Sequence, residues 1–290
     1  MTSFTIAPAA SFTAADLHAA NVAAFADYLA GPLTLTLDQW PSLIARQGID
    51  LGLSRVAVRD GQIVSYAFVC PREADGRWRL GIMGALPAAR GSGAAPALID
   101  DFLVRAKAHG MTHAELECFA ANERALRLYR GRGFEVVCPL SGWKLPADAA
   151  PAPARDAPAP ARDAPAHEVR VIDRASALAW LEDAGRRISW LPFPATARSQ
   201  SAQVRPLSFW QCGSALMLFS VLEGTPTHIH VLIDLDPALR DAETLARAIR
   251  AAHPDAFAPP VLRDDLGGDA LARAGFVRPA LNQVLMRRVL

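Results

Sequence analysis

Cysteine is scarce in this sequence, which has four among its 290 residues and no CxxC pair. This scarcity excludes a disulfide scaffold and a zinc ribbon, so we expect reduced and mostly buried thiols. Long apolar runs are missing too, because no uncharged stretch reaches the roughly 18 residues that a membrane span needs. The first Lys or Arg is Arg46, whereas a signal peptide begins with a positive region. We therefore expect a cytoplasmic protein that does not bind a membrane.

Neither sign of charge is in excess. The 30 Lys and Arg residues nearly balance 29 Asp and Glu residues, the formal net charge is +1, and no basic block occurs. A nucleic-acid partner is therefore not expected. Hydrophobic residues, by contrast, make up 51% of the chain, which is enough to bury a core. The length suits two domains, since single domains cluster at about 100–200 residues.

Residues 146–167 divide the chain. They consist mainly of Pro, Ala, Arg and Asp, and they repeat PAPARDA at 151–157 and 158–164. Alternating Pro and Ala favours extended backbone and offers nothing with which to build a core. The sequence therefore predicts a semi-rigid linker between a first domain, 1–145, and a second domain, 168–290. A docking motif for a partner is the alternative interpretation of the linker.

The first domain contains the signals of helices and of a mixed sheet. Asp60-Gly61 between two alternating runs indicates a hairpin, and the apolar spacing of 97–109 is typical of a helix packed on one face. Gly81 and Gly84 interrupt a strand, which suggests a bulge or the close approach of a ligand. We expect helices at 11–30, 37–46, 97–109 and 122–129, and strands at 54–58, 62–69, 77–86, 113–119, 134–137 and 142–145. This order predicts an α+β, or mixed α/β, fold.

The segment Arg90–Ala95, with the sequence RGSGAA, joins a strand to the helix that follows. Its two glycines let backbone N–H groups converge, and the helix adds the positive end of its dipole. With the charge of Arg90 the loop can hold an anion such as a pyrophosphate, and a plain Gly-rich turn is the alternative. The loop also approaches the dinucleotide fingerprint GxGxxG, but Pro96 replaces the third glycine and a hairpin precedes it.

Two ordered motifs in the first domain carry a family resemblance. The segment at 90–95 matches R/Q-x-x-G-x-G/A, with Pro87 shortly before it. Residues 116–134 match L-E-V-x-x-x-N-x-x-A-x-x-L-Y-x-x-x-G-F, and Cys118 in place of Val is the only departure. Both motifs resemble those of the GNAT superfamily of N-acetyltransferases. The resemblance covers about residues 3–145.

The resemblance implies transfer of an acetyl group from acetyl-CoA, as co-substrate, to an amine. It also implies a mostly antiparallel twisted sheet with a central splayed parallel pair, flanked by helices. The splayed strands would be 77–86 and 113–119. The backbone of Met83 and Ala85 would pair with the pantetheine arm, and a strand N–H there would steady the oxyanion. The implied contacts of the pyrophosphate and the rest of the cofactor are Arg90, Gly91, Ser92, Gly93, Ala94, Ala95 and Asn122.

The chemistry asks for two groups that handle protons. An amine with a pKa of about 8–10 is mostly ammonium at neutral pH, and only its neutral form attacks a thioester. The resemblance implies Glu117 as the base, directly or through water; a glutamate that faces solvent or pairs with an arginine is the alternative. It implies Tyr129 as the acid that protonates the leaving thiolate, and a buried core tyrosine is the alternative. Asn122 is expected to cap the helix that presents Tyr129.

The second half of the chain ends as the first half does, with an Ala-rich helix, Gly275-Phe276 and an alternating strand at 283–289. When Phe276 is aligned with Phe134, neither proton-handling residue nor the phosphate loop has a counterpart. Acidic residues follow the corresponding strand instead, and they would repel a pyrophosphate. They are Asp236, Asp241 and Glu243. We therefore expect a second, degenerate GNAT-like domain that shapes structure or substrate, and one acetyl-CoA per chain.

No metal site is expected. His228 and His230 share one face of a strand, but the sequence offers no third ligand, so both are expected to face solvent.

The acceptor is expected to be a small-molecule amine or a peptide N-terminus. Residues 30–39 with their flanking helices, and a last hairpin near 140–143, are expected to bind it. Phe25, Tyr28 and Trp40 can either line that pocket or belong to the core. The alternative to an enzyme is a regulatory or sensor protein that binds acetyl-CoA without turnover. The intact pair Glu117 and Tyr129 argues for the enzyme, because a sensor needs neither.

Overall fold

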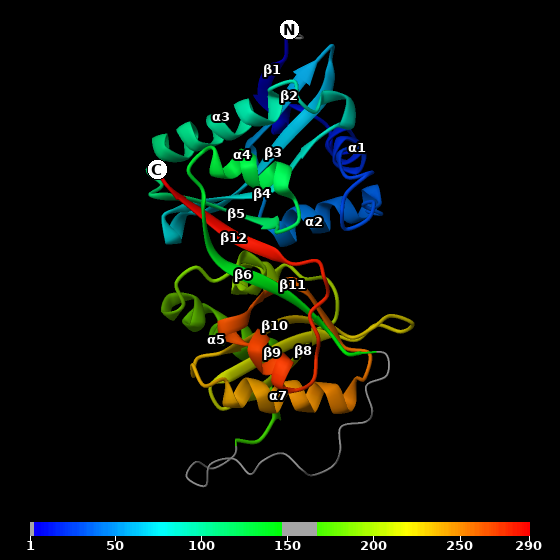
Figure 1. Ribbon diagram of the computed structural model, residues 1–290, viewed down its shortest axis with the longest axis vertical. Helices are drawn as coiled ribbons and strands as arrows, with labels where there is room; N and C mark the ends of the chain where they lie inside the picture. The colour runs from blue at the N-terminus through cyan, green and yellow to red at the C-terminus, as the bar shows by residue number, and fades with distance from the viewer. Residues whose placement is uncertain (1–2, 147–166) are drawn as a thin grey trace. The chain divides into compact units, whose positions relative to one another are not determined.

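A computed structural model describes residues 3–146 and 167–290 (Figure 1). It contains two compact units: unit 1 comprises Met1–Cys138 and Val284–Leu290, and unit 2 comprises Pro139–Gln283. Each combines helices with a sheet, so the predicted mixed α/β class is confirmed. The predicted linker lies, except for its two ends, outside the described residues. In the described part of the chain, no helix is both long and apolar enough to cross a membrane.

The strands of unit 1 are β1 (Thr5–Pro8), β2 (Asp50–Arg59), β3 (Gln62–Arg72), β4 (Arg77–Ala85), β5 (His113–Phe119), β12 (Gln283–Val289) and the start of β6 (Glu135–Lys144). Their order in the sheet is β1-β2-β3-β4-β5-β12-β6. Neighbours from β1 to β4 run antiparallel, whereas β4 and β5 run parallel. The hairpin predicted at Asp60-Gly61 joins β2 to β3, and both turn residues have positive φ, 51° and 75°.

The helices of unit 1 are α1 (Ala14–Ala24), α2 (Trp40–Gln47), α3 (Ala94–Ala108) and α4 (Glu123–Arg130), with 3-10 turns at Ala9–Ser11, Leu37–Gln39, Glu73–Asp75 and Pro87–Ala89. Thr13 and Asp16 form a capping box that starts α1. The helix predicted at 11–30 is too long. The chain leaves α1 at Phe25, whose ring packs edge to face on that of Tyr28 with the ring centroids 4.6 Å apart.

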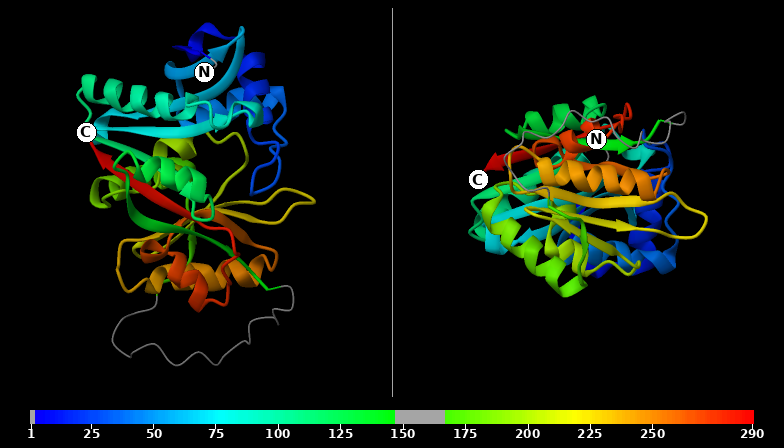
Figure 2. Two further views of the ribbon diagram at one scale, coloured as in Figure 1. Left: turned by 45° about the horizontal axis from the view of Figure 1, so that its top comes forward. Right: turned by 90° about the horizontal axis from the view of Figure 1, so that it is seen from below.

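Helices cover both faces of this sheet (Figures 1 and 2). Trp78 and Phe102 lie in the core between the sheet and the pair α3 and α4, and Trp40 and Phe68 lie in the core on the side of α1 and α2. All four side chains are almost completely buried. The cysteines are free, and three of them are buried, as predicted: Cys70, Cys118 and Cys212.

Strands β4 and β5 are paired over only part of their length. Their parallel ladder ends at Leu80 of β4, which pairs with Leu116 of β5. Gly81, the next residue, forms a bulge against β3, and a side chain at this position would collide with Cys70. A side chain at Gly84 would collide with Tyr66 instead. The bulge predicted at Gly81 is therefore confirmed, whereas Gly84 makes room for a neighbouring ring.

Unit 2 has a related architecture. Its sheet follows the order β6-β11-β10-β9-β8-β7. Strands β10 and β11 run parallel, and the other neighbours run antiparallel. Its further strands are β7 (Arg170–Val171), β8 (Ser208–Cys212), β9 (Ala215–Ser220), β10 (His228–Asp234) and β11 (Phe257–Arg263). Its helices are α5 (Arg174–Arg187), α6 (Ala197–Ser201), α7 (Arg240–Ala252) and α8 (Gly268–Arg273), with 3-10 turns at Phe193–Ala195 and Asp264–Leu266.

The units differ from the predicted domains in their final strands. Nearly all of β12 belongs to unit 1, where Met286 is fully buried in the core and the Leu290 N–H donates to the Thr112 carbonyl at 3.0 Å (Figure 2). β6 is one continuous strand where two were predicted, and its second half pairs with β11 in unit 2. The expected boundary at residue 145 therefore does not match the compact units, because alternation identifies a strand but not its neighbours.

Candidate active site

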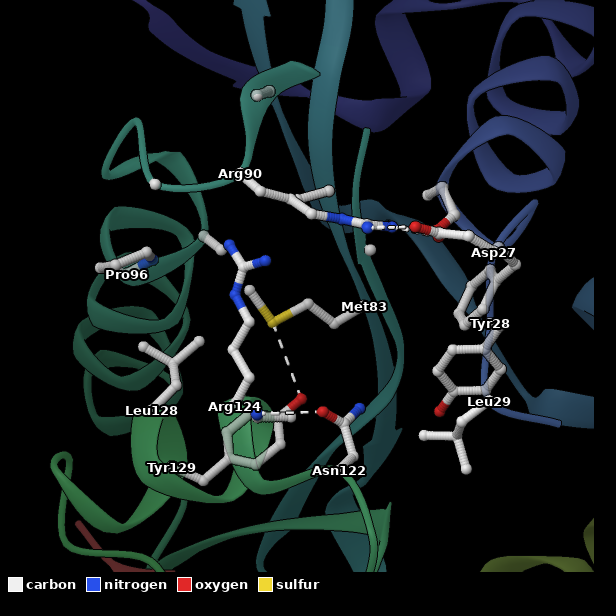
Figure 3. A pocket seen from close by; sticks show the side chains of 18 of the residues that line it. Asp27, Tyr28, Leu29, Met83, Arg90, Pro96, Asn122, Arg124, Leu128 and Tyr129 are labelled. Atoms are coloured by element: carbon white, nitrogen blue, oxygen red, sulfur yellow. Dashed lines mark hydrogen bonds and ion pairs between the residues drawn. The ribbon is translucent and has the colours of Figure 1, made fainter. Parts of the chain in front are cut away.

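A cavity of about 550 Å³ in unit 1 is formed by the end of α1, the end of β4, the loop before α3 and the start of α4 (Figure 3). The predicted site residues that line it are Met83, Ala85, Arg90, Gly91, Gly93, Ala95, Asn122 and Tyr129. The other lining residues are Ala24, Phe25, Asp27, Tyr28, Leu29, Gly84, Ala89, Pro96, Arg124, Ala125 and Leu128. The two sequence motifs thus meet at one cavity.

The loop before α3 presents open backbone amides. Gly91 and Gly93 have φ values of 83° and 88°, a region that glycine enters without steric cost. Within the described residues, no hydrogen bond uses the N–H groups of Gly91, Gly93 or Ala95. The first turn of α3 contains no acidic residue, and no side chain caps it. Open amides at the positive end of a helix are a combination that can hold an anion.

Two members of the predicted loop do not line the cavity. The Ser92 N–H donates to the Ala89 carbonyl at 3.2 Å, and the Ala94 N–H donates to the Ser92 hydroxyl oxygen at 3.4 Å. Their amides already have partners within the turn. That Ser92 and Ala94 contact a pyrophosphate stays a prediction.

Arg90 extends across the cavity to the segment that follows α1 (Figure 3). Two of its guanidinium nitrogens donate to the two carboxylate oxygens of Asp27 at 2.5 Å, and one also donates to the Ala24 carbonyl at 3.3 Å. The hydrogen bond from Arg90 lowers the pKa of Asp27. The motif arginine is therefore paired with a carboxylate in this structure.

Tyr129 lies in α4 with its side chain almost fully buried. Its hydroxyl donates to the sulfur of Met83, 3.9 Å away (Figure 3). Burial, together with nearby Cys118 and Tyr28, raises the pKa of Tyr129 well above its ordinary value. The phenol therefore stays protonated at neutral pH, where its hydroxyl can donate a hydrogen bond.

Tyr28 and Asn122 are two further polar residues that line the cavity. The ring of Tyr28 packs edge to face on Phe119, with the ring centroids 5.7 Å apart. Burial raises the pKa of Tyr28 to about 12, although a hydrogen bond with the Asn122 side chain opposes the shift. The Asn122 side-chain oxygen also accepts from the Ala125 N–H at 3.2 Å, so the predicted helix cap is confirmed.

Glu117 does not line the cavity. Both of its carboxylate oxygens accept hydrogen bonds from the Arg79 guanidinium at 2.7–3.1 Å, and both side chains are buried. Arg79 also donates to the side-chain oxygen of Gln47 at 3.0 Å. Burial alone would lower the pKa of Arg79, but the charge and hydrogen bonds of Glu117 outweigh it and raise that pKa. Glu117 thus pairs with an arginine, which the sequence analysis weighed as an alternative to its role as the base. Its role as the base stays a prediction.

The aromatic residues considered for the acceptor pocket separate into two groups. Phe25 and Tyr28 line the cavity. Trp40 is 2% exposed and belongs to the core of unit 1, and Trp143 is 2% exposed in the core of unit 2. The hairpin expected near 140–143 is the second half of β6 rather than a turn.

Sequence analysis missed two charged residues that line the cavity. Asp27 carries no local signal, because its partner Arg90 is 63 positions away along the chain. Arg124 has a weak signal: it lies in the first turn of α4, where the helix dipole disfavours a cation.

Residues 20–134 match the sequence profile of the acetyltransferase (GNAT) family. This part of the chain is similar to the GNAT family. A putative acetyltransferase from Pyrococcus horikoshii is similar in structure, with a TM-score of 0.66 and 14% identity, over 100% of this chain and 90% of that one. A GCN5-related N-acetyltransferase from Sphaerobacter thermophilus has a TM-score of 0.67 and 17% identity, and the match covers 99% of this chain and 95% of that one. A GCN5-related N-acetyltransferase from Kribbella flavida has a TM-score of 0.60 and 15% identity, and the match covers 99% of this chain and 71% of that one. At these identities the likeness establishes a GNAT fold. No curated protein matches the sequence.

In unit 2, α7 follows β10, the first strand of the parallel pair, and it begins differently from α3 of unit 1. Asp241 and Glu243 lie in the first turn of α7. The Ala242 N–H donates to Asp234 at 2.9 Å, and the Ser214 N–H donates to Asp241 at 2.9 Å. Carboxylates thus occupy the positive end of α7, where a phosphate would otherwise bind.

The two histidines of β10 do not form an exposed pair. His230 is 7% exposed and hydrogen-bonds the Ser220 hydroxyl at 2.8 Å, and the rings of His228 and His230 stack with their centroids 4.0 Å apart. The prediction that both face solvent is therefore wrong, because His230 lies in the interior of unit 2. Over residues 3–146 and 167–290, no group of three His, Cys, Asp or Glu side chains is placed to hold a metal ion.

Proposed function

We propose that unit 1 transfers the acetyl group of acetyl-CoA to a primary amine by direct attack in a ternary complex. The observation that supports this most strongly is that the open amides of Gly91, Gly93 and Ala95 and the protonated hydroxyl of Tyr129 line one cavity. Figure 3 places Arg90 and Tyr129 at opposite ends of the view. An elongated molecule with an anionic part and a thioester fits such a site.

The donor is proposed to bind along β4. Its pyrophosphate accepts hydrogen bonds from the amides of Gly91, Gly93 and Ala95, and Arg90 contributes positive charge. The β4–β5 ladder ends at Leu80, which leaves the backbone near Met83 and Ala85 for the pantetheine amides. Asn122 caps the start of α4 and so fixes this end of the helix at the cavity.

Two residues of the GNAT segment are proposed to move protons. The acceptor ammonium gives a proton through water to Glu117, since this carboxylate does not itself line the cavity. The neutral amine then attacks the carbonyl carbon, a C–N bond forms, and the C–S bond breaks as the tetrahedral intermediate collapses. Tyr129 donates its proton to the departing thiolate. Its hydroxyl already contacts a sulfur atom, that of Met83, which supports this assignment.

The acceptor is proposed to be a small-molecule amine or a peptide N-terminus. Phe25 and Tyr28 offer it an aromatic wall. Unit 2 is proposed to be a degenerate GNAT-like domain with a structural or substrate-shaping role, since carboxylates occupy the start of α7.

Release of free thiol from acetyl-CoA by the full chain, with a panel of primary amines and short peptides, tests the proposal. We expect thiol release that depends on the acceptor and that disappears when the same peptides carry an acetylated N-terminus. Binding of acetyl-CoA without thiol release across the panel would contradict the enzyme and favour a sensor.

A further inference from the structure

We propose that Arg124 is the second cationic ligand of the cofactor phosphates, with a role separate from that of Arg90. The inference rests on the proposed function, in which acetyl-CoA is the donor. The motif directs attention to Arg90, but Asp27 balances the charge of Arg90 through two hydrogen bonds of 2.5 Å. Arg124 also lines the cavity, and among the described residues it forms no ion pair.

The position of Arg124 is unfavourable unless an anion binds nearby. It is the second residue of α4, at the positive end of the helix, where acidic side chains are preferred. The acid beside it does not compensate, because Glu123 lies 3.7 Å from Arg127, one turn further along. The helix after β11 in unit 2, α8, has Asp269 at its second position, which is the usual choice.

The direction of the Arg124 side chain matches this role. Figure 3 shows it running from α4 into the cavity, with its guanidinium toward the loop between Arg90 and Pro96. The same loop carries the open amides of Gly91 and Gly93. A guanidinium binds two phosphate oxygens in its plane, which amides and a lysine do not reproduce.

The charges of the lining residues are consistent with this assignment. Among them, Arg90 and Arg124 are the cations and Asp27 is the acid. After Arg90 is paired with Asp27, one positive charge remains, and it belongs to Arg124. A pyrophosphate at the loop therefore finds an uncompensated cation on α4, in addition to the paired Arg90 of the motif.

Calorimetric titration of the full chain with acetyl-CoA tests the inference. Arg124→Ala should weaken binding about tenfold to a hundredfold, the loss expected for a charge-assisted hydrogen-bonded pair. Arg124→Lys should restore only part of the affinity, because it keeps the charge but not the planar fork. Arg127→Ala, which removes a cation one turn along the same helix, should bind like the wild type.

A donor without phosphates separates phosphate binding from a structural role. With S-acetylpantetheine in the thiol-release assay, Arg124→Ala should retain the wild-type rate constant. An equal loss with both donors, or unchanged acetyl-CoA affinity in Arg124→Ala, would overturn the inference while the proposed function stands. Failure of the wild type to bind acetyl-CoA would overturn the proposed function itself.

Discussion

The chemistry proposed for Tyr129 follows from its surroundings. The ring packs on Phe134 with the centroids 5.9 Å apart, and the hydroxyl meets the sulfur of Met83. Burial raises the pKa of the phenol, so a titration near neutral pH does not remove its proton. The hydroxyl is therefore placed to donate a hydrogen bond. Because burial makes it a weaker acid than a free tyrosine, proton transfer to a thiolate requires a strong hydrogen bond between the two groups.

Tyr129→Phe should lower kcat about 10²–10⁴-fold, because the thiolate then leaves without a proton. The ring remains, so acetyl-CoA affinity and the unfolding temperature should stay near the wild-type values. High pH should not restore the rate, since it does not help to protonate a leaving group. The pH dependence of kcat in the thiol-release assay measures this, and near-wild-type turnover would remove Tyr129 from the mechanism.

Glu117→Gln should slow the reaction most at low pH, and the deficit should shrink as pH rises and more of the acceptor is already neutral. The change also weakens a buried ion pair with Arg79, so stability should fall, by at most about 3–5 kcal/mol. Profiles of rate against pH, together with urea unfolding, separate the two effects.

Glu115→Gln is the matched control for this substitution. Glu115 lies two residues earlier on β5, is 1% exposed, and pairs with Arg72 at 2.6 Å and Arg77 at 3.0 Å. It should lose stability to a similar extent while the shape of its pH profile remains that of the wild type. If both glutamine variants show the same pH-independent deficit, Glu117 is a structural residue and not the base.

For individual residues, the sequence predicted which side chains line the cavity better than it predicted which side chains form ion pairs. Gly93, Asn122 and Tyr129 were found because each belongs to a motif with fixed spacing. The pairing of Glu117 with Arg79 could not be specified, because the partner lies 38 positions away and depends on how two strands align. Tertiary neighbours of this kind leave no periodic signal in the sequence.

Among the elements, the loop before α3 and the end of α1 are joined by the ion pair between Arg90 and Asp27. The pair brings together two segments that are far apart in the chain and that both line the cavity. A pyrophosphate bound at the loop, as proposed, would compete with Asp27 for the same guanidinium. Removal of the Asp27 charge should therefore strengthen binding of the donor, whereas removal of the Arg90 charge should weaken it.

Asp27→Asn should strengthen acetyl-CoA binding about two- to fivefold, the scale of an exposed ion pair. Asp100→Asn is the control, because Asp100 has a similarly exposed side chain, 59% against 55%, and pairs with Arg132 away from the cavity lining. Calorimetry on the two variants measures the difference. Weaker binding in Asp27→Asn would show that the ion pair supports the site instead of competing for Arg90.

The sequence predicted which elements exist more reliably than where they end. Alternation and the Asp60-Gly61 turn located β2 and β3, and apolar spacing located α3. The helix expected at 11–30 stops at Ala24, and Tyr28 beyond its end packs on Phe119 of β5. Helix periodicity alone does not report such a tertiary effect.

In the whole molecule, the two units have similar strand orders. They differ at the start of the helix that follows the first strand of each parallel pair, which is α3 in unit 1 and α7 in unit 2. In unit 1, α3 begins with open amides, whereas in unit 2, Asp234 and Asp241 occupy the start of α7. The missing phosphate loop of the second half was visible in the sequence. The membership of β12 in unit 1 was not, because it depends on which strand it pairs with.

Gly93→Val should reduce acetyl-CoA affinity by more than about a hundredfold, because φ of 88° is strained for a branched residue and the loop amides must move. Gly110→Val is the matched control: Gly110 ends the same helix with φ of 76°, and a side chain at either position meets no atom within 4 Å. Both variants should lose similar stability, and only Gly93→Val should lose affinity.

Calorimetric titration of the full-length wild type with acetyl-CoA tests the central claim, that the cavity of unit 1 is the cofactor site of the chain. We expect one acetyl-CoA per chain, and no measurable binding to a folded Gly93→Val protein. No heat of binding, a stoichiometry of two, or unchanged affinity in Gly93→Val would contradict the account.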